Sequence, residues 1–555
     1  MCLFKLDGLK ELPSTSSWDV EKMQRKASLI VLVLSIVGFA IWSFLLGQDA
    51  SWDIKNYHYY NAYALLSGRL DYDIAPAQQQ TYLNPALDIL PYLLAKHFPP
   101  YIFGIAIGAW QGINFWLLFL IGREIFAQIK FPRPTLWALI CGLAGVTGAI
   151  SVSEVGTTFH DLSLSVFILG AVYIYLREWF KVSPNTGMSL RVLLCSGFLL
   201  GIAAGLKLTF AIYGLGMVTA IVVVQIIIQK KYQVLLPFGF AALTGLLLTA
   251  GPWMWFLWKQ YENPLFPMAN AIFHSPYYLN QNTFDARFLP KSIWQAVSFP
   301  FHFNLSVHEG NELRFRDMRE ATLYVCSGLA VVYWLIKRLV DRRVDSRVVA
   351  DPADHLSVLW LLILIWATYL AWIKLFSVYR YLVCIELLSP IALVALVGSI
   401  ANTKAVQGFL LATLLFLIFN GKAPDWGRMP WAADFFGVHP PSSVQLSSNA
   451  VVLIASDSPL AYVIPSFPEK VRFVRIEGNF LKPSQQTALT DRIRQIIAES
   501  VDDLYLLTDS ASISQSIKVT NQYLNGHTVA AESCASVSSR ADSSIILCRL
   551  APSSR

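Results

Sequence analysis

The sequence predicts an all-α polytopic membrane protein that carries a small α/β domain outside the membrane at its carboxyl end. Hydrophobic residues make up 55% of the chain and charged residues only 14%, whereas soluble domains are roughly a quarter charged. About eleven apolar runs are long enough to cross a hydrocarbon core of ~30 Å. From Gly421 onwards the apolar runs shorten and become strand-like, which indicates a change to a water-exposed domain.

The first apolar run covers about residues 27–46 and is followed by no small-residue cleavage site, so we expect it to remain as a membrane helix rather than a removed signal peptide. The remaining runs lie near 100–121, 135–153, 162–177, 191–210, 211–229, 235–258, 321–336, 357–376, 381–400 and 405–420.

Short loops on alternate sides of these runs set the expected orientation, because Lys and Arg accumulate on the cytoplasmic side. The net charge of +7 is spread over these loops, so it predicts no nucleic-acid partner. We expect a multi-pass protein of the inner (plasma) membrane with a cytoplasmic amino terminus (1–27), a membrane domain (28–420) with outer loops 48–99 and 259–320, and a periplasmic domain (421–555). The basic loops contain Lys22, Arg25, Lys26, Arg123, Lys130, Arg133, Arg177, Lys181, Arg191, Lys230, Lys231, Lys337, Arg338, Arg342, Arg343 and Arg347.

The carboxyl-terminal domain shows strand-like and helix-like segments. Leu489, Ile493, Ile496 and Ile497 recur at helical spacing within 483–500, which predicts a helix. Cys534 and Cys548 lie close enough in sequence for a disulfide in an oxidising compartment; the sequence leaves the bridge open. The expected strands begin at Val451, Val471, Leu504 and Ile545.

The first outer loop is unusually polar and aromatic for a segment that directly follows a membrane helix. Short helices are expected at about 56–66 and 88–96, lying flat at the interface. His58, Asp71, Asp73 and Asn84 in this loop are candidate substrate-binding residues.

Four ionisable residues fall at the outer ends of separate apolar runs, where charge is costly and therefore a functional candidate. Asp53 suits a general base or an interfacial cap before the helix near 56. Asp161 suits a second carboxylate or a helix cap. Lys207 either binds an anionic headgroup of the substrate or extends its ammonium group to the lipid headgroups by snorkelling. Arg380 suits a phosphate, because its planar fork donates two charge-assisted hydrogen bonds.

Two acids and two cations from four spans would thus meet at one membrane surface. An acid that activates a hydroxyl and cations that hold a departing phosphate are what in-line sugar transfer from a lipid phosphate requires. Tyr379 and Tyr381 flank Arg380 and fit either substrate contact or an aromatic belt.

With these residues the chain resembles the GT-C superfamily of integral membrane glycosyltransferases, most specifically around 52–91, 251–278 and 377–390. The resemblance implies a polyprenyl-phosphate-linked sugar donor, Asp53 as general base, Asp161 as supporting carboxylate, and hexosyl or pentosyl transfer with inversion. Trp52-Asp-Ile-Lys55 departs from the paired Asp-Glu of protein O-mannosyltransferases, which favours a lipid or glycan acceptor in the cell envelope over a protein acceptor.

Two other functions stay open. An O-antigen polymerase or ligase would use an Arg- and His-rich outer loop; a transporter would show internal repeats with charges near mid-membrane, and we find no repeat. The sequence contains no CxxC or HExxH pattern, so it gives no positive case for a metal site. Whether a divalent cation takes part stays open, and so do the identities of the sugar and the acceptor. The residues that favour the polymerase or ligase are His302, His308, Arg314, Arg316 and Arg319.

Overall fold

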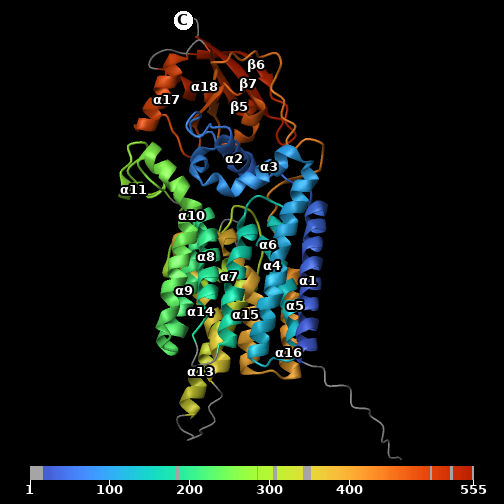
Figure 1. Cartoon of the computed structure of the whole chain (residues 1–555). Coiled ribbons are helices and arrows are strands. Elements are labelled where there is room, and N and C mark those ends of the chain that lie inside the picture. Colours follow the sequence, from blue (N-terminus) through green and yellow to red (C-terminus); the bar gives the residue numbers. More distant parts are fainter. Residues whose placement is uncertain are drawn as a thin grey trace, which may run out of the picture.

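A computed structural model describes residues 17–182, 187–283, 285–303, 309–341, 352–500, 503–524 and 529–552. A bundle of long helices carries the first outer loop at one end, and the carboxyl-terminal domain covers that loop (Figure 1). His308, Arg342, Arg343 and Arg347, together with residues 1–16, lie outside the described residues. The predicted fold class is confirmed: a helical membrane domain is followed by a small α/β domain.

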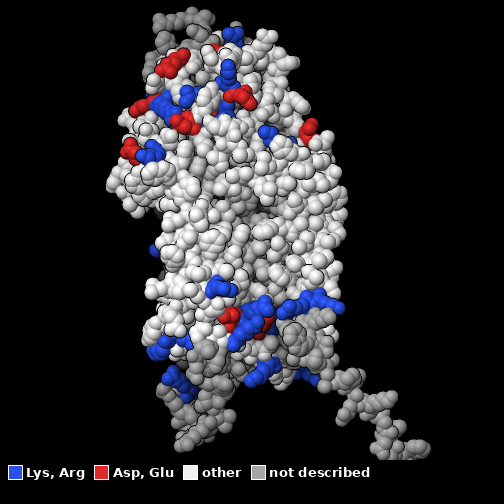
Figure 2. All heavy atoms as spheres, in the orientation of Figure 1, with Lys and Arg blue, Asp and Glu red and all other residues white. Residues whose placement is uncertain are grey.

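Eight helical segments of the described chain are long and apolar enough to cross a membrane, and three shorter apolar helices match the other predicted runs. The chain is therefore a multi-pass membrane protein. Lys and Arg gather at the end of the bundle away from the carboxyl-terminal domain, below a belt with few charges on the face shown (Figure 2). The long segments are α1 (Ser17–Leu46), α4 (Pro100–Gln128), α7 (Asp161–Lys181), α9 (Ala211–Ile221) with its π-helical extension, α10 (Leu235–Tyr261), α13 (Arg319–Asp341), α14 (Pro352–Leu375) and α15 (Val383–Ile400); the shorter ones are α5 (Pro134–Val146), α8 (Leu190–Leu206) and α16 (Lys404–Asn420).

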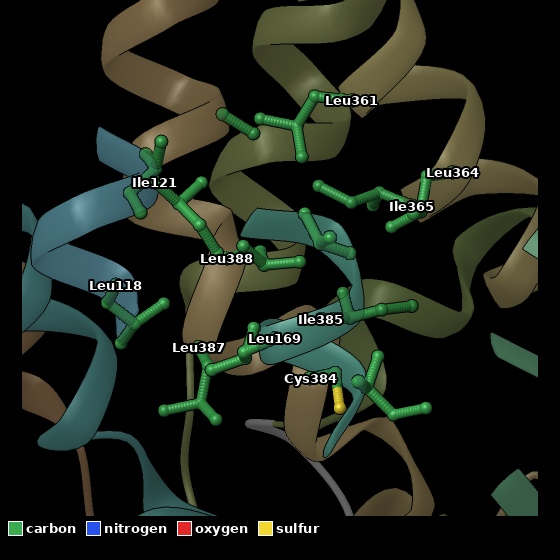
Figure 3. Packing of buried hydrophobic residues seen from close by; sticks show 14 of the residues in the cluster. Leu118, Ile121, Leu169, Leu361, Leu364, Ile365, Cys384, Ile385, Leu387 and Leu388 are labelled. Atoms are coloured by element: carbon green, nitrogen blue, oxygen red, sulfur yellow. The ribbon is translucent and has the colours of Figure 1, made fainter. Parts of the chain in front are cut away.

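Helix α15 forms the centre of the bundle. Apolar residues lie on all its sides, and 83% of its most apolar 18-residue stretch is buried. Leu387 and Leu388 lie on the side of Leu118 and Ile121 of α4, in a buried cluster that also contains Leu361, Leu364 and Ile365 of α14 (Figure 3). By contrast, only 17% of the corresponding window in α1 is buried, which leaves α1 at the lipid-facing edge. The turn that precedes α15 is thereby fixed by the best-packed helix of the domain.

The predicted run 135–153 is broken into two helices. Helix α5 ends at Val146 and a separate short helix, α6 (Ala149–Glu154), begins after Gly148. The cause is Glu386 of α15, whose carboxylate accepts hydrogen bonds from the N–H groups of Ile150 and Ser151 at 2.8 and 2.9 Å. A Cβ at Gly148 would lie 2.0 Å from the Glu386 carboxyl carbon, so only glycine leaves room for this contact.

The first outer loop contains the two short helices that the sequence predicts. A π-helical segment precedes the first of them, and a 3₁₀ turn precedes the second. The π-helical segment (Ile54–His58) leads into α2 (Tyr59–Leu66), and the 3₁₀ turn (Pro85–Asp88) leads into α3 (Ile89–His97). Tyr57, Tyr60 and Tyr63 are buried. The tyrosines of this loop therefore contribute to the core between the bundle and the carboxyl-terminal domain.

The carboxyl-terminal domain has a five-stranded sheet in the order β4-β3-β5-β7-β6, with β3 parallel to β4 and β5 and the other pairs antiparallel. Helix α17 begins at a capping box on Thr487, and the four predicted strands are confirmed, whereas β6 was not predicted. Cys534 of β6 and Cys548 of β7 lie opposite each other and form a disulfide. The elements are β3 (Val451–Ala455), β4 (Arg472–Glu477), α17 (Ala488–Glu499), β5 (Leu504–Asp509), α18 (Ile513–Asn521), β6 (Val529–Ser536) and β7 (Ile545–Pro552).

The first outer loop extends this sheet. Ile74 forms a parallel bridge to Val474 on the outer side of β4. A second contact pairs β1 (Gln48–Asp49) with β2 (Arg428–Met429), which is the first strand after α16. The carboxyl-terminal domain is thus held on the first outer loop by backbone pairing at two places.

Candidate functional site

Asp53 and Arg380 form an ion pair at the outer end of the bundle. Asp53 lies directly before the π-helical segment, and Arg380 lies in the 3₁₀ turn Tyr379–Leu382 that opens α15. The Arg380 Nη1 donates to Asp53 Oδ2 at 2.8 Å, and the Tyr57 hydroxyl donates to the same oxygen at 3.1 Å. The side chain of Asp53 is only 11% exposed and that of Arg380 only 18%, so the ion pair is largely shielded from water.

Asp161 and Lys207 form a second ion pair nearby. Asp161 is the first residue of α7, and Lys207 follows the last residue of α8. Lys207 Nζ donates to Asp161 Oδ1 at 2.6 Å and to the Phe159 carbonyl oxygen at 2.9 Å. His160 precedes α7 in a left-handed conformation with φ of 66°, which turns the chain sharply at this point.

Aromatic rings join the two ion pairs into one cluster. Lys207 Nζ and Arg380 Cζ each lie 5.4 Å from the centroid of the Tyr381 ring. Arg380 Cζ also lies 5.0 Å from the centroid of Phe159. A cation over an aromatic face is stabilised by the ring quadrupole. The structure therefore brings Asp53, Asp161, Lys207 and Arg380 together, although they come from four distant parts of the sequence.

A buried His–Asp–His group lies in the same region. Asp88 Oδ1 is 2.6 Å from His58 Nδ1 and 2.8 Å from His160 Nε2. Burial lowers the pKa of both histidines well below the ordinary value, and it raises the pKa of Asp88 well above the ordinary value. Both imidazoles are therefore neutral near neutral pH. Asp88 was not among the sequence-predicted site residues.

Glu154, at the end of α6, is a further acid that sequence reasoning missed. It is fully buried, and its Oε2 accepts a hydrogen bond from the Leu162 N–H at 2.8 Å. Burial, with Asp161 as the next contribution, raises the pKa of Glu154 well above its ordinary value. The available signal was that Glu154 is the only acid in the apolar stretch that precedes His160 and Asp161.

Several buried polar atoms of this cluster have no hydrogen-bond partner among the described residues. They are Glu154 Oε1, Asp161 Oδ2, His58 Nε2 and Arg380 Nε. Most buried polar groups in native proteins are paired, so each exception needs an explanation. Each of these atoms is therefore a candidate contact for a polar ligand.

Tyr379 points away from this cluster and towards a buried acidic group beneath it. Its hydroxyl lies 3.2 Å from Glu320 Oε2 and 3.4 Å from Glu386 Oε2 and donates to these carboxylates. Glu386 also holds the start of α6 (described above). Tyr379 is therefore placed to fix the turn that carries Arg380, and Tyr381 alone of the two tyrosines contacts the cations.

The remaining predicted residues make contacts elsewhere. Asp71 pairs with Arg492 of α17 at 2.8 Å. Asp73 accepts two hydrogen bonds from Arg69, at 2.7 and 2.8 Å. The Asn84 amide donates to backbone oxygens of α8 and α10, which ties the loop to the bundle. The structure thus places Asp71, Asp73 and Asn84 at contacts that hold the first outer loop in place.

His58, Asp88 and His160 are also a group of described residues that could hold a metal ion. One potential ligand atom from each lies within 4.8 Å of the others. Two neutral imidazoles and a carboxylate are a donor set that suits zinc or a similar divalent ion. The Nε2 of His58 is buried and has no hydrogen-bond partner among the described residues, so it is a candidate metal ligand.

No protein-family model matches the chain, and a search of curated proteins found no match. Several solved structures are similar to it, and three of them follow. The first is the S. cerevisiae protein O-mannosyltransferase Pmt1-Pmt2 complex bound to the sugar donor, with 13% identity and a TM-score of 0.32 over 46% of this chain. This chain covers only 36% of that relative.

The other two similarities extend over most of the chain. ArnT from Cupriavidus metallidurans, bound to undecaprenyl phosphate, shares 12% identity with a TM-score of 0.36, covering 96% of this chain and 98% of its own. The Archaeoglobus fulgidus oligosaccharyltransferase in the apo form shares 12% identity with a TM-score of 0.43, covering 94% and 75%. At this level of identity and overlap, function has to be inferred from the site residues of this chain.

Proposed function

We propose that the protein is a membrane glycosyltransferase that moves a sugar from a polyprenyl-phosphate donor to a lipid or glycan acceptor at the outer face of the membrane in which it lies. The observation that carries this proposal is the cluster in which two ion pairs adjoin and four buried polar atoms lack partners. Such a cluster offers cations for a phosphate and carboxylates for a hydroxyl within one site.

Lys207 and Arg380 are the groups that hold the donor phosphate. Both are less than one fifth exposed, at 18% each, so their charge acts in a poorly hydrated environment where electrostatic attraction is strong. Arg380 already uses Nη1 on Asp53, and its Nε is unpartnered. A phosphate oxygen at Nε would join the guanidinium without first displacing another acceptor.

Asp53 is the proposed general base. Its carboxylate takes the proton of the acceptor hydroxyl while the hydroxyl oxygen bonds to the anomeric carbon of the sugar. The bond from that carbon to the phosphate oxygen breaks, and its electron pair stays on the phosphate, which Lys207 and Arg380 stabilise. Attack opposite to the leaving phosphate inverts the anomeric carbon, and Asp161 keeps Lys207 in position through its 2.6 Å contact.

The proposed orientation is that of an inner-membrane protein with a periplasmic carboxyl-terminal domain. The concentration of Lys and Arg at the opposite end of the bundle (Figure 2) supports it. The donor headgroup and the acceptor would then meet beneath the first outer loop, which the carboxyl-terminal domain covers.

A divalent cation held by His58, Asp88 and His160 is a further part of the proposal. The ion would supply positive charge for the donor phosphate, next to Lys207. Asp88 would then bind as a carboxylate, since ligand groups must be deprotonated to bind metal.

The loop that would favour a polymerase or ligase makes contacts within the protein. His302 pairs with Glu309, and Arg316 donates to the Asn420 carbonyl oxygen. Arg319 is buried against Asp317. None of these contacts adds a specific observation in favour of that function.

The test uses the purified protein in lipid nanodiscs with a panel of synthetic polyprenyl-phosphate hexoses and pentoses and an envelope lipid extract as acceptor. Mass spectrometry follows the release of polyprenyl phosphate and the gain of sugar on the acceptor. We expect release with at least one donor, and loss of release in Lys207→Gln but not in Lys259→Gln, a lysine at the end of α10. A correctly folded protein that releases polyprenyl phosphate from none of the donors contradicts the proposal.

A further inference from the structure

A second candidate binding site lies at the basic end of the bundle, away from the cluster described above. A cavity of about 290 Å³ opens between α1, α4 and α7. We name it the basic cavity. Its charged lining comprises Arg25, Arg123 and Arg177, one arginine from each helix.

The polar side of the basic cavity is organised by hydrogen bonds. Arg177 Nη1 donates to the Tyr173 hydroxyl at 3.0 Å. Arg123 is only 18% exposed and pairs with Glu124 at 3.3 Å. The residues that line the cavity include three arginines and no acid among the described residues.

The part of the lining that lies one to two turns further along α1 and α4 is apolar. Leu29 and Leu32 of α1 and Leu120 of α4 line it together with Trp116, whose indole N–H donates to Ser28 Oγ at 2.9 Å. Leu29 is 60% exposed and belongs to the lipid-facing side of α1. The cavity therefore joins a cationic rim to the surface that contacts lipid tails.

We infer that the basic cavity binds the phosphate of an anionic glycerophospholipid from the leaflet at the basic end, with an acyl chain along Leu29 and Leu32. Basic pockets between membrane helices on the cytoplasmic side suit anionic lipid headgroups. Arginine suits phosphate oxygens through paired hydrogen bonds. Inorganic phosphate would use the cationic rim but leave the apolar wall uncovered, so the geometry favours a lipid. This site is independent of the proposed transferase activity.

The experiment measures the thermal stability of the full-length protein in a zwitterionic detergent while phosphatidylglycerol, phosphatidylcholine or inorganic phosphate is added. A ligand that binds only the folded state raises the Tm with its concentration. We expect phosphatidylglycerol to raise the Tm, with phosphatidylcholine and inorganic phosphate far less effective. The double variant Arg123→Gln/Arg177→Gln should need about tenfold more phosphatidylglycerol for the same rise.

The matched control is Lys230→Gln/Lys404→Gln, which removes two exposed charges near the same end of the bundle and should respond like the unmodified protein. Leu32→Trp fills the apolar wall without changing charge and should also weaken the response, which covers a failure of the arginine variant to fold. An equal response to phosphatidylcholine or to inorganic phosphate overturns the inference. So does an equal loss in the lysine control.

Discussion

Arg380 donates a hydrogen bond to Asp53 across 2.8 Å, although the two residues are 327 positions apart in the sequence. This pair connects the start of the first outer loop to the turn that opens α15, which is the most buried of the eight membrane-length helices among the described residues. The base candidate and the phosphate-binding candidate are thus direct partners, so each sets the charge and orientation of the other.

This contact predicts energetic coupling between Asp53 and Arg380. Removal of one member leaves the other as a poorly solvated charge, so Asp53→Asn and Arg380→Gln should each lower the Tm. The double variant should lose less than the sum of the single losses, with a coupling of about 1–3 kcal/mol. Thermal unfolding of the four proteins in the same detergent measures it, and additive losses would show that the pair contributes nothing.

The buried Glu154 predicts a pH-dependent stability difference. Its folded-state pKa lies well above 4.5, mainly because of burial, so folding takes up a proton between the two pKa values. This group therefore makes the folded state progressively less stable as the pH rises from 4.5 towards the folded-state pKa.

Glu154→Gln removes that dependence while its amide oxygen can still accept from the Leu162 N–H. The Tm of this variant relative to the unmodified protein should increase between pH 4.5 and about 7.5. A Tm difference that stays constant over this range would contradict the buried, protonated state of Glu154.

Asp73 is predicted to hold the carboxyl-terminal domain on the first outer loop. Its buried carboxylate accepts from Arg69, from the Tyr60 hydroxyl and from the N–H of Phe473 in β4. Asp73→Ala leaves Arg69 uncompensated and should cost roughly 3–5 kcal/mol, seen as a lower Tm and faster proteolysis. Asp71→Asn is the matched control and should cost at most ~1 kcal/mol, because its pair with Arg492 is partly exposed.

The histidine group predicts a response to chelators. If His58, Asp88 and His160 hold a divalent ion, the purified protein should contain close to one equivalent of metal by elemental analysis. His160→Ala should lose that metal, and EDTA should lower the Tm of the unmodified protein but not that of the variant. Metal content that is absent from both proteins when prepared without chelator would exclude the ion from the proposal.

Much of the membrane architecture could be predicted because apolar length and the distribution of basic loops are local properties of the sequence. The break between α5 and α6 could not, since it depends on Glu386 meeting Gly148 across 238 positions, a contact that no local pattern encodes. Strand β6 was missed because Val529-Ala-Ala-Glu-Ser-Cys-Ala-Ser536 lacks bulky apolar alternation. It is held instead by pairing with β7 and by the disulfide.

The site was predictable to the extent that membrane boundaries restrict where charges lie. Asp53, Asp161, Lys207 and Arg380 were predicted from their places at the ends of apolar runs, and the structure brings them together. Asp88 and Glu154 were missed because their importance comes from burial beside His160 and Asp161, which is a tertiary property. Asp71 and Asp73 show the converse, since acids in the same loop contact Arg492 and Arg69 instead.

The most direct test of the central claim is the turnover of Asp53→Asn in the nanodisc assay, with donor binding measured on the same preparation. We predict that release of polyprenyl phosphate falls by at least about a hundredfold, while the variant stays folded and still binds polyprenyl phosphate through Lys207 and Arg380. Turnover within about twofold of the unmodified protein would contradict the assignment of Asp53 as the base.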